Sequence, residues 1–117
     1  MGTAGESLVM GNIVYMKSDG KLWKADANAA GLFPAMAMAL GTIAANASGS
    51  FLLSGQARAD STWSWTIGGL LYLSTTAGLM TQTKPAATDD CIQVLGVAFP
   101  NADTVNFTPS PDYVTSA

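Results

Sequence analysis

Apolar residues in this chain gather in short stretches, and small or polar turn-forming residues separate them. The clearest case is segment 68–83, in which the apolar stretches 70–74 and 79–83 flank a short polar turn. Gly78 stands where such a turn needs a residue that tolerates a positive φ. The segment therefore predicts a β-hairpin.

Segment 11–25 repeats this arrangement, with a predicted strand over 12–16, a turn ending at Gly20, and a partner strand over 21–25. Tyr15 corresponds to Tyr72 at an offset of 57 residues (72 − 15). We therefore predict two pseudo-repeated β units, joined by a Trp-rich crossover over 59–66. Their approximate bounds are 11–55 and 69–109.

Stretch 33–40 fits two structures. Its alanine, methionine and leucine residues favour a helix by propensity. The larger residues alternate strictly with alanines, between a proline and a glycine, and this favours a strand. We choose a strand, because 94–99 supplies a counterpart at an offset of 59 residues (94 − 35). Ala37 and Gly96 then correspond, at a place where a backbone approaches closely or a strand bends.

The remaining segments add further short elements. We expect one helical turn over 26–31, capped by Asp26, a strand over 50–58 kinked at Gly55, and strands over 92–99 and 104–108. The sum is seven or eight short strands and no helix of three turns. This predicts an all-β fold, a small barrel or sandwich in which one unit folds face to face with its copy.

A chain of 117 residues suffices for one domain with a single core. We expect an N-terminal arm over 1–11, a single β-domain over 12–109 and a C-terminal tail over 110–117. The arm is made largely of small residues, and such a segment can add a strand to a sheet edge on a partner. We therefore expect the arm to reach a neighbouring molecule.

The composition limits the classes of partner. Hydrophobic residues make up 49% of the chain and charged residues only 11%, against about a quarter in typical soluble domains. Such a neutral surface predicts that another molecule covers much of it, most simply a copy of the chain. Five Lys and Arg residues are too few for a nucleic-acid groove. The longest apolar stretch, residues 32–40, is too short to cross a membrane, and no signal peptide is recognised.

The residues that usually carry catalysis are missing. The chain has no histidine, which is the commonest general base and metal ligand. Its one cysteine, Cys91, cannot build a zinc site, and because it precedes an apolar strand it is interpreted as a buried free thiol. We expect no enzyme activity, no metal and no cofactor.

Aromatic residues are the best candidates for contacts with other molecules. Trp63 and Trp65 are two positions apart, so in an extended segment their rings lie on one side. Three roles stay open: capping the core, anchoring a subunit or partner interface, and stacking on a sugar or base. The full set of candidate interface residues is Trp63, Trp65, Trp23, Tyr113, Gly2 and Thr3.

Several runs resemble small structural proteins of tailed bacteriophages. The runs are GNIVY, KSDGK, WTIGGLLYLSTTAG, QVLGVA and DTVNFTPS, and the resemblance covers roughly residues 10 to 114. Related stretches occur in head decoration (cement) proteins and in modules of phage fibres.

This resemblance implies an all-β protein without catalytic residues, commonly a homotrimer, that is assembled in the bacterial cytoplasm. Its place would be the virion, bound to the major capsid protein on the outer surface of the head. The alternative is a fibre or receptor-binding module in which Trp63 and Trp65 stack on host glycan.

Overall fold

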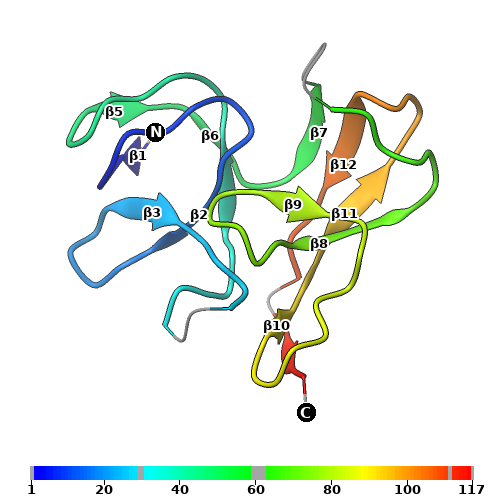
Figure 1. Ribbon diagram of the computed structural model, residues 1–117. Helices are drawn as coiled ribbons and strands as arrows, with labels where there is room; N and C mark the ends of the chain where they lie inside the picture. The colour runs from blue at the N-terminus through cyan, green and yellow to red at the C-terminus, as the bar shows by residue number, and fades with distance from the viewer. Residues whose placement is uncertain (1, 29–30, 59–62, 111, 117) are drawn as a thin grey trace.

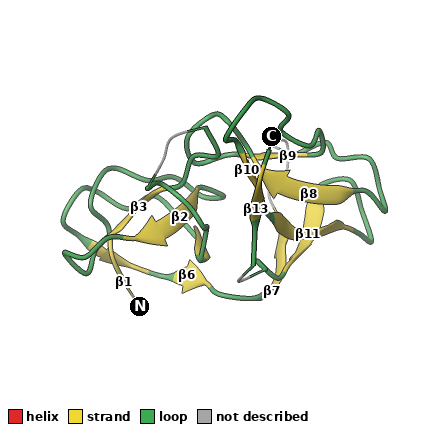
Figure 2. Ribbon diagram, turned by 90° about the horizontal axis from the view of Figure 1, so that it is seen from below, coloured by secondary structure: helices red, strands yellow, loops and turns green. Residues whose placement is uncertain are grey.

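The computed structural model describes residues 2–28, 31–58, 63–110 and 112–116. These residues form thirteen β-strands and no helix, so the predicted all-β class is confirmed (Figures 1 and 2). Seven of the strands have three or more residues, and the other six have two. The molecule is flat, with extents of 34 × 34 × 20 Å.

The first half of the chain builds a four-stranded antiparallel sheet, called here the first sheet. Apolar residues occupy successive positions of its strands, so both faces carry apolar side chains. In spatial order they are β3 (Leu22–Lys24), β2 (Ile13–Met16), β4 (Ala37–Ala39) and β6 (Phe51–Leu52).

The second sheet has five antiparallel strands and lies beside the first in both views (Figures 1 and 2). Its central pair, β8 and β11, is interrupted by a bulge between Val94 and Gly96. In spatial order the strands are β7 (Gly55–Arg58), β12 (Thr104–Phe107), β11 (Val94–Ala98), β8 (Leu70–Leu73) and β9 (Met80–Thr81).

Two short strand pairs tie down the ends of the chain. Near the N-terminus, β1 (Gly2–Thr3) pairs with β5 (Ser48–Gly49). Near the C-terminus, β13 (Val114–Thr115) pairs with β10 (Cys91–Ile92). The predicted arm and tail therefore both take part in the fold of their own chain.

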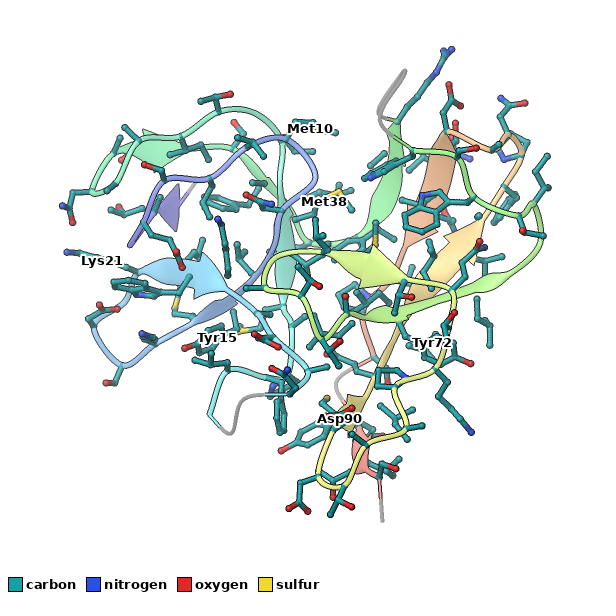
Figure 3. The ribbon with its side chains drawn as sticks, in the orientation of Figure 1. Met10, Tyr15, Lys21, Met38, Tyr72 and Asp90 are labelled. Atoms are coloured by element: carbon teal, nitrogen blue, oxygen red, sulfur yellow. The ribbon has the colours of Figure 1, made fainter. Side chains whose placement is uncertain are left out.

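The two sheets share their strand order and their pairing register. The order β3-β2-β4-β6 matches β9-β8-β11-β12. Val14 pairs with Ala37, and the residues at the predicted offsets, Leu71 and Gly96, pair with each other as well. This agreement supports the predicted repeat, although duplication itself stays a prediction. Tyr15 and Tyr72, the expected equivalents, lie in separate sheets (Figure 3).

The sheets do not pack through equivalent faces. The main core lies between them and takes Ile13, Tyr15 and Met38 from the first sheet, but Leu71 and Leu73 from the second. Under the offset of 57, Ile13 and Tyr15 correspond to Leu70 and Tyr72, which point away from that core. One face of the first sheet thus packs on the non-equivalent face of the second.

The remaining face of the first sheet is covered in large part by the chain's own N-terminal arm. Ala4 and Leu8 are completely buried there, in a second cluster called here the arm core. Leu8 exchanges two backbone hydrogen bonds with Ile43, of 2.8 and 2.9 Å. The arm is therefore a structural layer of this domain, and its expected contact with a neighbour stays a prediction.

The hairpin turn at Gly78 locks the two sheets together. Its φ is +80°, as the sequence predicted. The Gly78 carbonyl accepts a hydrogen bond from Ile13 N, and the Gly78 N–H donates to the Ala25 carbonyl, both at 2.8 Å. A side chain at this position would stand 3.1 to 3.2 Å from Asn12 and Lys24. The absence of a side chain therefore lets the turn fit between two segments of the first half.

Three predicted strands differ in extent from those observed. The strand expected over 33–40 spans only β4. The strand expected over 50–58 divides at Gly55, whose φ is +134°, so that β6 and β7 belong to different sheets. The strand expected over 92–99 is broken at Gln93 into β10 and β11. In the last two cases the chain changes its pairing partner within the stretch.

The helical turn expected over 26–31 stays a prediction, because only part of this segment is described. Asp26 does cap the segment, because its Oδ1 accepts a hydrogen bond of 3.0 Å from Asn28 N. Residues 27 and 28 lie in a turn, and Gly31 has a φ of +84°. Residues 29–30 lie outside the described part, as do residues 59–62 of the predicted crossover.

Candidate functional site

Trp63 and Trp65 lie together against the main core. Their ring centroids are 6.3 Å apart and the rings are tilted by 45°. Both side chains are partly buried and pack on the core cluster. A side chain on Gly11 would come within 3.1 Å of the Trp63 ring, so this glycine makes room for it. The arrangement matches the core-capping interpretation of the pair, and both rings lie on one side as expected.

Trp23 is held by its own hairpin. Lys17 Nζ lies 4.0 Å from the centre of its ring, which is a cation–π contact. Its Nε1 donates a hydrogen bond of 3.3 Å to Asp19 Oδ2. The ring also covers Gly5 of the arm, where an added side chain would meet it. Trp23 therefore fixes the arm to the first hairpin.

Tyr113 and the pair Gly2 and Thr3 lie in two further places. The Tyr113 ring packs edge-on against Phe33, with centroids 5.1 Å apart and an angle of 76° between the planes. Tyr113 remains 41% exposed. Gly2 and Thr3 pair with Gly49 and Ser48 across β1 and β5. The six candidate residues thus contact different neighbours and do not form one site.

An apolar groove opens beside β1, on the face of the first sheet that the arm only partly covers. It has a volume of about 200 Å³. Its most exposed members are Leu53, Met36 and Met16, with exposed fractions of 69%, 48% and 47%. The groove is lined by Gly2, Met16, Leu22, Met36, Ala37, Phe51 and Leu53. Large apolar side chains left this exposed around one hollow are typical of an interaction surface.

The second sheet leaves its other broad side without a covering layer in the described residues. Leu70 is opposite Val97, and Tyr72 is opposite Val94. Leu70 is 44% exposed, and the other three side chains are partly buried. Thr81 and Asn106 extend this surface across the neighbouring strands. We call these six residues the outer face.

Gln93 is a buried polar residue whose role the sequence did not indicate. It is completely buried. Its Oε1 accepts a hydrogen bond of 2.7 Å from Ala35 N, and its Nε2 donates to the Ala35 and Ser110 carbonyls at 2.9 and 2.7 Å. The side-chain amide acts as a peptide group would in a sheet, and it joins the chain ahead of β4 to the C-terminal segment.

The described residues contain no group of histidine, cysteine or acidic side chains that could hold a metal ion. Cys91 is a buried free thiol, as predicted. Burial raises its pKa from 9.0 to about 11, because an apolar environment disfavours the charged thiolate.

We expect Cys91 to react slowly with a disulfide reagent at pH 8. A pKa of about 11 lowers the thiolate fraction about a hundredfold relative to an ordinary thiol. Because the folded pKa is raised, the thiol favours the folded state at neutral pH, and this contribution is lost as the pH rises from about 9 to about 11. Absorbance-based thiol titration, with and without denaturant, measures the rate. Equal rates in both would contradict the prediction.

No family model, curated protein or solved structure was found to match this chain in three separate comparisons. None of the described residues lies in a helix long and apolar enough to pass through a membrane.

Proposed function

We propose that this chain is a non-enzymatic virion protein that decorates the outer surface of a tailed-phage head and stabilises it. The proposal is carried by the resemblance of five sequence runs, spread over residues 10 to 114, to small structural proteins of tailed phages. The proposed partners are the major capsid protein and other copies of the chain, most simply in a homotrimer.

The shape and the charge of the molecule support this proposal. A body 34 Å wide in two directions and 20 Å thick presents a broad side of about 1,100 Å². This exceeds the roughly 800 Å² that each partner contributes to a standard interface. With only 13 charged residues in the chain (5 + 8), such a side can be covered at little desolvation cost.

A decoration protein of this kind works by adding buried interface across the joints of a closed shell. Each copy contributes a modest free energy. Many copies act together, since opening one joint disturbs the contacts of several neighbours. This role uses no reactive group, in keeping with a sequence that lacks histidine.

The test is binding to expanded, DNA-free phage heads. We expect the protein to bind saturably, with a fixed number of copies per head, and to raise the temperature at which the heads break open. Co-sedimentation measures the binding, and light scattering during heating measures the rupture. Absence of binding, together with saturable binding to host cells or glycans, would favour the fibre module instead.

Substitution of an exposed residue tests the role of the arm better than deletion does. Deleting residues 2–10 would remove Ala4 and Leu8 from the arm core and would damage the fold. Val9 is 55% exposed, so Val9→Asp changes the arm surface and leaves the core intact. Loss of head binding in this variant would support a capsid contact by the arm. Unchanged binding would contradict it.

A further inference from the structure

We propose that copies of this chain associate head to tail, with the outer face of one copy seated on the apolar groove of the next. The inference concerns contacts between copies and does not depend on what the assembly binds. It follows from the packing of the two sheets through faces that do not correspond to each other.

The fold already contains one contact of this kind. Inside the chain, the face of the first sheet that carries Ile13 and Met38 packs on the face of the second sheet that carries Leu71. By register, Ile13 and Met38 correspond to Leu70 and Val97 of the outer face. The outer face is therefore the second unit's version of a surface that is buried in the first unit.

The groove lies on the first sheet's equivalent of the surface that receives this contact. The face of the first sheet that corresponds to the Leu71 face carries Val14, Ala37 and Phe51. The arm covers most of this face, and the groove is the part that it leaves open, next to Met16 and Met36. Within the chain, the first sheet's equivalent of the outer face packs on the Leu71 face of the second sheet. The groove is part of the first sheet's equivalent of that Leu71 face.

The charges favour a second copy as the occupant. Every residue of the groove and of the outer face is uncharged. Two copies with a net charge of −3 each can therefore meet through these surfaces without placing like charges in contact. A charged partner such as nucleic acid would gain nothing from either surface.

The size of the surface predicts how the association depends on concentration. The outer face spans four strands, and four strands about 4.8 Å apart and about four residues long cover about 250 Å². This is well below the roughly 800 Å² per partner of a standard interface, so one contact alone is weak. Because the two surfaces differ, the contact is heterologous, and a closed ring gives every copy two contacts.

Two charge substitutions test the proposal. Leu70→Lys alters the outer face, and Met36→Glu alters the groove. Both side chains are nearly half exposed, so the fold tolerates the change, and circular dichroism verifies this. Val114→Lys, at a 62% exposed position on β13, is the matched control. Sedimentation velocity over a wide concentration range measures the mass of each protein.

We expect the wild type and Val114→Lys to become heavier as concentration rises, and each test variant to need at least a tenfold higher concentration. An equimolar mixture of Leu70→Lys and Met36→Glu should associate where neither does alone. Half of its contacts join two unaltered surfaces, and in the other half the introduced lysine faces the introduced glutamate. A wild type that stays monomeric, variants that associate normally, or a mixture that stays monomeric would each overturn the proposal. Head binding can succeed or fail independently of all three.

Discussion

Replacing Gly96 with alanine should destabilise the protein by at least about 3 kcal/mol. A Cβ at this position would collide with the backbone oxygen of Asn106 and would stand 3.2 Å from the Cα of Phe107. Both atoms belong to β12, which lies between β11 and β7 in the second sheet. Relief of the clash requires a movement of backbone in the middle of a sheet, which is more costly than rotating a side chain. Urea unfolding followed by circular dichroism measures the change.

The control for this variant is Gly20→Ala. Gly20 has a φ of +81°, and an added Cβ would meet no atom within 4 Å. Its expected cost is about 1 kcal/mol, from backbone strain alone. The difference between the two variants isolates the effect of close approach. Similar losses in both would contradict the explanation given for Gly96.

The second large effect is expected for Gln93→Ala, with a loss of about 3 to 5 kcal/mol. The substitution removes the partners of Ala35 N and of the Ala35 and Ser110 carbonyls. Each buried group left without a partner costs about 1 to 3 kcal/mol. Some of this cost is offset where water reaches the gap. The free energy of unfolding in urea is again the measured quantity.

Gln56→Ala serves as the matched control for Gln93→Ala. Gln56 is exposed on β7, and its truncation should change the free energy of unfolding by less than about 0.5 kcal/mol. If the two glutamine variants were equally stable, the buried amide would not join the two segments as described.

The strands themselves were predictable, because alternation of apolar and polar residues is a local signal. The hairpin at Gly78 and the offset between Tyr15 and Tyr72 came from residue types and spacing alone. The need for a small residue at Gly96 was also predicted, and the structure confirms it with the close backbone of β12.

The contacts between segments far apart in the sequence were not predictable in the same way. The residues around Gly55 do not indicate that β6 and β7 belong to different sheets. The small residues of the arm suggested a contact with a neighbouring molecule and gave no sign that Ala4 and Leu8 are buried on the first sheet of their own chain. Gln93 gave no signal, since a polar residue within an apolar strand usually points to solvent.

The candidate interface was predicted mainly from tryptophan residues. In the structure, most of these side chains pack against other residues of the same chain. Trp63 and Trp65 rest on the main core. The surfaces left open are instead lined by aliphatic and methionine residues such as Met16 and Met36. The sequence alone does not separate these from the buried Met38, because all three lie in or beside similar strands.

The layer that Ala4 and Leu8 form on the first sheet determines at which end of the chain further units could be added. A third unit encoded after the second would find the outer face of β8 and β11 ready to receive it, in the manner of the existing pair. A unit encoded ahead of the first would have to strip the N-terminal layer from its sheet. Longer descendants of this design should therefore carry their added units toward the carboxyl end.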